Sequence, residues 1–158
     1  MVSSSKLLWI STQTASLLTG KVTKTIYRWA DDGAIQTQQE GGRLQIDLES
    51  LGAQIEIPID DELRHQVRLA EEGRASAMLE IGLLFLQAQL PELAFRWFEQ
   101  AARKGHLDAM DWLSICYAEG IGVAANGPLA LRWLGEAAAH GHLIAKAKVQ
   151  ALASNLLA

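Results

Sequence analysis

The chain has 158 residues, of which 49% are hydrophobic and 20% are charged, and its formal net charge is −4. These proportions exclude a disordered chain, allow a buried core, and make nucleic-acid binding by net charge alone unfavourable. The longest apolar run, Ile81 to Leu86, is too short to cross a membrane. A single cysteine, Cys116, fits a reducing cytoplasm, which is the location we expect.

The first part of the chain predicts two short helices joined by a turn. Ser11 or Thr12 can cap the first helix, and Thr19-Gly20 breaks it. Thr23 can cap the second helix, which Gly33 ends. The second helix is expected to bury one stripe, formed by Val22, Ile26, Trp29 and Ala30.

A hairpin and a last helical turn follow these helices. Residues 34–39 and 43–46 alternate as strands about the turn Glu40-Gly41-Gly42. Residues 47–51 can then start a short helical turn. The predicted order over residues 7–51 is therefore helix, turn, helix, hairpin, helix.

This order resembles the winged helix-turn-helix of phage excisionases and bacterial MerR-type regulators. The residues that carry the resemblance are Trp9-Ile10-Ser11-Thr12, Ala15, Leu18, Thr23 to Trp29, Gly33 and Gly41-Gly42-Arg43. In that family the second helix enters the major groove and the hairpin wing lies along the backbone or minor groove. Carried over by position, the resemblance implies that double-stranded DNA is contacted by Lys21, Thr23, Lys24, Thr25, Tyr27, Arg28 and Arg43.

The charge of this segment limits the expected affinity. Residues 1–57 carry 5 basic and 6 acidic side chains, so duplex binding by one copy is expected to be weak and sensitive to salt. We expect Asp31 and Asp32, at the end of the second helix, to point away from the basic residues. A homodimer would double the phosphate contacts. The alternative is a helix-turn-helix used for protein contact or dimerisation, without DNA.

A domain boundary is predicted near Pro58. Proline disfavours helix at the residue before it, and Asp60-Asp61-Glu62 places negative charge in the first turn of a new helix. We therefore expect an N-terminal domain of residues 1–57 and a second domain of residues 58–158.

The second domain contains an internal repeat. Ala94, Arg96, Trp97 and Gly105 recur 36 positions later, and a shorter unit with a 32-residue spacing precedes them. Each unit predicts two antiparallel helices, about 75–87 and 91–104, then 108–118 and 128–140. A half unit at 64–73 and a lone helix at about 143–153 are expected to cap the array.

The repeat resembles the Sel-one-like repeat, a relative of the tetratricopeptide repeat, over residues 64–145. The resemblance implies a mainly α fold in which a short α-solenoid of helix pairs follows the small winged domain. It also implies that the repeats bind a protein partner or mediate self-association. Apolar residues stand where the family usually has polar ones on the concave surface, namely Leu79, Leu83, Trp112 and Ile115. These residues are either buried against the N-terminal domain or a second copy, or form a groove for a partner's peptide or helix.

No set of residues predicts catalysis, a metal or a cofactor. Cys116 has no identifiable histidine partner, and His140-Gly141-His142 has no third ligand at suitable spacing. The sequence therefore predicts a DNA-binding regulatory or adaptor protein that is not an enzyme. The alternative is a protein-interaction scaffold without DNA binding.

Overall fold

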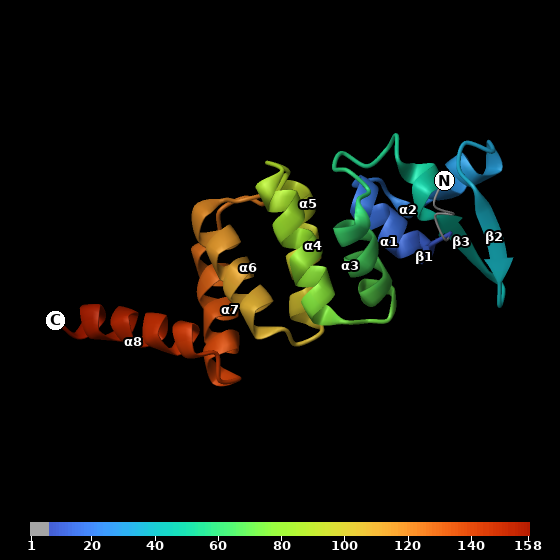
Figure 1. The fold of residues 1–158 in the computed structure, drawn as a ribbon. Helices are drawn as coiled ribbons and strands as arrows, with labels where there is room; N and C mark the ends of the chain where they lie inside the picture. Colours follow the sequence, from blue (N-terminus) through green and yellow to red (C-terminus); the bar gives the residue numbers. More distant parts are fainter. Residues whose placement is uncertain (1–6) are drawn as a thin grey trace. The chain divides into compact units, whose positions relative to one another are not determined.

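A computed structural model describes residues 7–158 and shows a mainly α protein (Figure 1). The chain divides into two compact units, an N-terminal unit that ends at Arg74 and a repeat unit from Ala75 to Ala158. No helix in residues 7–158 is both long and apolar enough to cross a membrane.

The N-terminal unit begins with a short strand and two helices. The strand is β1 (Trp9–Ser11), and the helices are α1 (Thr12–Thr19) and α2 (Thr23–Asp31). The Ser11 side chain accepts a hydrogen bond from the Thr14 N–H and so caps α1, and Gly20 ends α1 in a left-handed conformation. The predicted start and end of the first helix are confirmed.

A three-stranded antiparallel sheet completes the predicted hairpin. β3 (Arg43–Asp47) lies in the centre, between β1 and β2 (Thr37–Glu40), and a 3-10 turn, η1 (Leu48–Leu51), follows. Gly41 and Gly42 both have positive φ, at 56° and 76°, as a two-residue hairpin turn of this type requires. The sequence did not predict β1. The side chains of this unit that are fully buried include Ile10, Leu18, Ile26, Ile46, Leu48 and Leu51.

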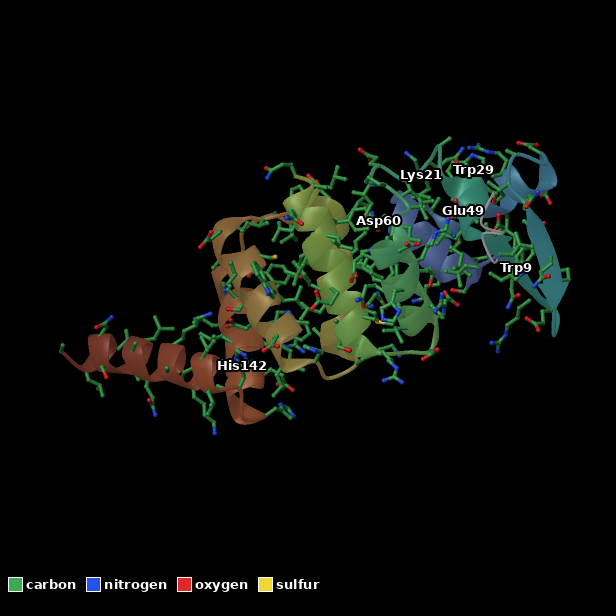
Figure 2. All side chains as sticks on the ribbon, in the orientation of Figure 1. Trp9, Lys21, Trp29, Glu49, Asp60 and His142 are labelled. Atoms are coloured by element: carbon green, nitrogen blue, oxygen red, sulfur yellow. The ribbon has the colours of Figure 1, made fainter. Side chains whose placement is uncertain are left out.

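Helix α3 (Asp61–Glu71) belongs to the N-terminal unit. Asp60 caps it through the Leu63 N–H, and it packs against β1 (Figure 2 labels Asp60). The Glu71 carboxylate accepts hydrogen bonds from the Ser11 N–H at 3.1 Å and from the Ser11 hydroxyl at 2.9 Å. The structure thus places the division after Arg74, later than the predicted boundary at residues 57/58. A helix that the sequence assigned to the repeats is hydrogen-bonded to the strand at the start of the chain.

The repeat unit consists of five helices among its described residues: α4 (Ala75–Gln87), α5 (Pro91–Arg103), α6 (Leu107–Glu119), α7 (Gly127–Ala139) and α8 (Leu143–Leu157). α4 packs against α5 and α6 against α7, as the predicted helix pairs require. Proline stands in the first turn of both α5 and α7, where its missing N–H has no helical partner. The predicted solenoid is confirmed.

The close approach of paired helices depends on small residues at the crossing points. A Cβ atom on Gly82 would lie 2.6 Å from the Phe98 ring, so only glycine leaves room for that ring between α4 and α5. Phe98 in turn stacks on Trp112 of α6, with ring centroids 5.4 Å apart. One aromatic side chain therefore connects three successive helices of the repeat unit.

Candidate interaction surfaces

The residues predicted to contact DNA lie on α2, in the turn before it and on the hairpin of the N-terminal unit. Six of the seven are exposed, namely Lys21, Thr23, Lys24, Tyr27, Arg28 and Arg43, while Thr25 is half-buried. Arg43 is the first residue of β3, directly after the Gly41-Gly42 turn. The structure thus presents these side chains to solvent, and DNA contact stays a prediction.

Two expectations about α2 are wrong. Thr23 is the first helical residue, and the residue before α2 is Val22, whose side chain cannot cap the helix. Val22 is 65% exposed and does not join the buried stripe, of which Ile26 is the fully buried member. Val22 is the extended residue directly before α2, so its side chain does not continue the helical stripe.

The acidic residues at the end of α2 lie on the same side as the cations. Lys24, Arg28 and Asp31 are spaced i, i+4 and i+7, which places them on one face of a helix. Asp31 and Asp32 line the same open hollow, of about 590 Å³, as Lys24 and Arg28. The expectation that these acids point away is therefore wrong, and their negative charge opposes phosphate binding at this face.

The four residues predicted to bind a partner do not form an exposed apolar patch. Leu79 on α4 is only 7% exposed, and Leu83, Trp112 and Ile115 are half-buried. The Trp112 ring is occupied by its stack on Phe98. The large hydrophobic residues that the repeat unit does expose lie mainly on α8, and they are Leu131, Leu143, Ile144, Val149, Leu152, Leu156 and Leu157.

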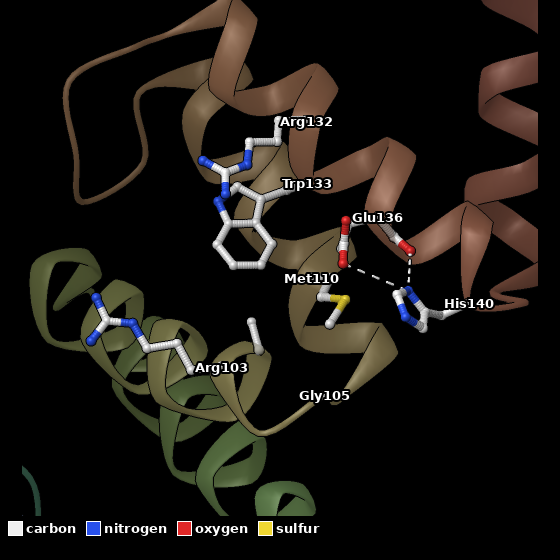
Figure 3. A pocket seen from close by; sticks show the side chains of 8 residues that line it. Arg103, Gly105, Met110, Arg132, Trp133, Glu136 and His140 are labelled. Carbon is white, nitrogen blue, oxygen red and sulfur yellow. Dashed lines mark hydrogen bonds and ion pairs between the residues drawn. The ribbon is translucent and has the colours of Figure 1, made fainter.

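A pocket of about 360 Å³ lies between α5, α6 and α7 (Figure 3). We call it the α5–α7 pocket. Its lining residues are Ala102, Arg103, Gly105, Met110, Arg132, Trp133, Glu136 and His140. α5 contributes the first two, α6 contributes Met110, α7 contributes Arg132, Trp133 and Glu136, and His140 is the residue directly after α7, so the pocket exists only where successive repeats stack.

Helical spacing explains how α7, with His140 directly after it, supplies half of the lining. Arg132, Glu136 and His140 stand at i, i+4 and i+8, and Trp133 is adjacent to the first of them. Met110 contributes its thioether from the first turns of α6, between the α5 and α7 residues (Figure 3). The pocket therefore has an apolar centre, Trp133 and Met110, with charged side chains around it.

The charges around the α5–α7 pocket are not evenly distributed. Arg103 forms an exposed ion pair with Glu99 at 2.8 Å, one turn earlier on α5. Arg132 is exposed and makes no hydrogen bond or ion pair with any residue that the structure describes. At the other side, His140 Nδ1 lies 2.9 Å from the Glu136 carbonyl oxygen and 3.8 Å from its carboxylate. The pocket thus has two arginines at one end and Glu136 with His140 at the other (Figure 3).

One residue of this pocket belongs to the sequence repeat, but only the structure shows that it is accessible. The Arg-Trp pair at 132–133 repeats the pair at 96–97, but the two tryptophans have different surroundings. Trp97 is 1% exposed, whereas Trp133 is half-buried and lines an open pocket. A repeated residue that is buried in one copy and accessible in the next marks the place to look for a site.

His142 has a structural role at the start of α8 (Figure 2). Its Nδ1 accepts the Ala145 N–H at 3.2 Å, and its Nε2 lies 2.8 Å from the Asp108 carboxylate on α6. The ring therefore carries its proton on Nε2, which donates to Asp108. This arrangement joins the starts of two helices that are one repeat apart.

Cys116 is unsuited to nucleophilic chemistry. The pKa of its thiol is raised from 9.0 to about 11, chiefly by burial in α6; a backbone hydrogen bond lowers it, and the nearby Glu119 carboxylate makes a smaller raising contribution. Since the thiolate is the reactive form, this thiol is almost fully protonated at neutral pH.

The geometry of the repeat unit is that of an α-solenoid built from antiparallel helix pairs. The sequence of this region matches the Sel1 repeat family as two successive repeats, at residues 66–106 and 107–142. The first match begins inside α3, which the structure assigns to the N-terminal unit. The sequence repeat and the compact unit therefore overlap without coinciding.

A solved structure supports the same assignment. The chain is similar to a Sel1 repeat protein from Oxalobacter formigenes, with 28% sequence identity and a TM-score of 0.52 over 66% of this chain. The chain spans 33% of the length of that protein. No curated protein matches the chain significantly.

Proposed function

We propose that this protein is a non-enzymatic interaction adaptor, acting in the cytoplasm, whose Sel1 repeats bind a protein partner. The observation that carries the proposal is the α5–α7 pocket, which joins an accessible tryptophan to an arginine without an ion-pair partner among the described residues. Tryptophan and arginine are the residue types that contribute most often to binding energy at protein interfaces. The protonated, buried Cys116 supports a role without covalent chemistry.

Site-specific photo-crosslinking in cells that naturally make the protein tests this proposal. A photoreactive residue at position 136, in the pocket, is expected to form discrete protein adducts. The same residue at position 118, an exposed site at the end of α6, serves as the matched control. Adducts from position 136 that disappear in Arg132→Glu support the proposal. Equal adduct patterns from both positions, or none from position 136, contradict it.

A second candidate function is duplex DNA binding by the N-terminal unit. The observation in its favour is the exposure of Lys24 and Arg28 on α2 together with Arg43 beside the hairpin turn. Asp31 and Asp32, which line the same hollow as these α2 cations, oppose DNA binding, so the affinity of a single copy would be low. A homodimer, which would place two α2 helices on one duplex, belongs to this candidate.

Fluorescence anisotropy with a labelled random-sequence duplex tests the second candidate. We expect lower affinity for the duplex, and a weaker dependence of that affinity on salt concentration, in the variant Lys24→Ala/Arg28→Ala/Arg43→Ala. Arg74→Ala/Lys104→Ala/Lys146→Ala removes the same charge elsewhere and is the control. Equal binding by both triple variants would contradict DNA contact through α2. Binding that does not depend on salt concentration would contradict it as well.

A further inference from the structure

We infer that the α5–α7 pocket binds an extended peptide segment in which an acidic side chain precedes or follows a bulky apolar one. This inference rests on the proposed function and names the chemistry of the partner. The volume of about 360 Å³ is at the small end of the range of binding pockets, enough for one or two side chains and too small for a helix. The occupant is therefore the side chains of a short segment.

The arginine end of the pocket selects a carboxylate. Arg132 has no ion-pair partner among residues 7–158, so its guanidinium donors are available to a ligand. Among the described residues Arg103 pairs with Glu99, and such an exposed i,i+4 ion pair on a helix contributes little to stability. Guanidinium groups match the planar geometry of a carboxylate and can bind it through two parallel hydrogen bonds. A peptide carboxylate therefore competes successfully for Arg103 and finds Arg132 free.

The centre of the pocket selects an apolar side chain. Trp133 is half-buried and offers part of its indole ring, and the buried Met110 provides a polarisable thioether at the base. Both groups can pack against aliphatic and aromatic side chains of different shapes. A leucine or an aromatic residue next to the acidic residue would fill this part of the pocket.

The Glu136 end restricts where the acidic residue of the segment can lie. A second carboxylate placed there would meet the Glu136 carboxylate, which lies on the opposite side of the pocket from the arginines (Figure 3). Like charges in contact oppose binding and are a common source of specificity. The pocket thus admits one acidic residue at the arginine end and disfavours acidic residues at both ends of the segment.

Selection from a displayed library of random twelve-residue peptides on the immobilised full-length chain tests the inference. We expect enriched peptides with one Asp or Glu beside Leu or an aromatic residue. Enrichment of peptides without an acidic residue overturns the inference and leaves the proposed function standing. Failure to enrich any peptide overturns the inference as well. The proposed function itself falls only if the crosslinking at position 136 also fails.

Affinities of one enriched peptide for matched variants complete the test. Arg103→Glu/Arg132→Glu is expected to weaken binding by about tenfold or more, since each lost charge-assisted hydrogen bond contributes about 1.5–3 kcal/mol. Lys104→Glu/Lys146→Glu makes the same change in net charge outside the pocket and should bind within about twofold. Trp133→Phe keeps the fold and an aromatic surface while reducing the contact area, so an intermediate loss is expected. Equal losses of peptide affinity in both double variants overturn the inference, because the effect would then come from the net charge and not from contacts in the pocket.

Discussion

The N-terminal unit and the repeat unit fix their helices by different means. In the N-terminal unit, β3 pairs with two strands, and α3 is tied to β1 by the Glu71–Ser11 hydrogen bonds. The β1–β3 pairing and the hydrogen bonds between Ser11 and Glu71 join segments that are far apart in the sequence. In the repeat unit each helix packs mainly on its neighbours in the chain, as α4 does on α5 and α6 on α7.

This difference explains why the sequence located the repeat helices better than the domain boundary. A repeat helix is marked by local signals, a proline at its start and a glycine after its end, and these recur with the period. The assignment of α3 to the N-terminal unit depends on contacts with a distant segment, such as the hydrogen bonds between Glu71 and Ser11. The buried residues of α3 are Leu63, Val67 and Ala70. Their ordinary helical spacing would suit packing against the core of either unit.

The largest expected effect tests whether α3 belongs to the N-terminal unit. Leu63→Ala removes a fully buried side chain of α3 and is expected to cost about 2–5 kcal/mol of stability. Hydrogen exchange should then accelerate in β1, α1 and β3 more than in α6 and α7. The matched change Leu113→Ala in α6 should give the opposite pattern. If Leu63→Ala accelerates exchange chiefly in α4 and α5, the assignment of α3 is wrong.

The pH dependence of stability should reveal Cys116 in the repeat unit. Because the folded-state pKa is raised from 9.0 to about 11, the unfolded chain loses the thiol proton first. The free energy of unfolding should therefore fall as pH rises from about 9 to about 11, by up to about 2–3 kcal/mol. Below pH 9 the thiol is protonated in both states and contributes no pH dependence. Denaturant unfolding of the wild type and of Cys116→Ala measures the difference in slope, and identical slopes would contradict the burial of this thiol.

Two glycines in the repeat unit should respond to alanine with opposite signs. Gly82→Ala places a methyl group 2.6 Å from the Phe98 ring and is expected to lower stability by about 1–3 kcal/mol. Gly135, in the middle of α7, has open space around its Cβ position. Gly135→Ala should raise stability by about 0.5–1 kcal/mol through helix propensity. Thermal unfolding of both variants checks the pair, and a stabilising Gly82→Ala would refute the close packing of α4 on α5.

The smallest effect concerns the cap that links α1 to α3. Ser11→Ala removes the acceptor for the Thr14 N–H and one donor to Glu71, and should lower stability by about 1 kcal/mol. Ser76→Ala, at an exposed position in the first turn of α4, is the control and should be neutral within about 0.5 kcal/mol. Chemical denaturation resolves the two. A neutral Ser11→Ala would show that the cap adds nothing to the N-terminal unit.

The candidate sites were less predictable than the helices. Exposure of Lys24 and Arg28 followed from the spacing on α2, but the position of Asp31 beside them depends on where that helix ends. The α5–α7 pocket brings Arg103 of α5 and Arg132 of α7 to the lining of one hollow, and the pattern of a single helix cannot show this. Leu79 and the other apolar residues of its group were predicted either to be buried or to form a groove for a partner, and hydrophobicity alone did not distinguish the two.

The central claim is that a protein partner binds in the repeat unit, at Trp133 in the α5–α7 pocket, and not in the N-terminal unit. The five tryptophan indole N–H signals in a proton–nitrogen NMR spectrum report on both units, since Trp9 and Trp29 lie in the N-terminal unit and the other three in the repeat unit. Titration with an enriched acidic peptide should shift the Trp133 signal most and leave those of Trp9 and Trp29 in place. A shift largest at Trp112 would place the partner on the α4–α6 residues instead. Shifts confined to Trp9 or Trp29 would contradict the claim outright.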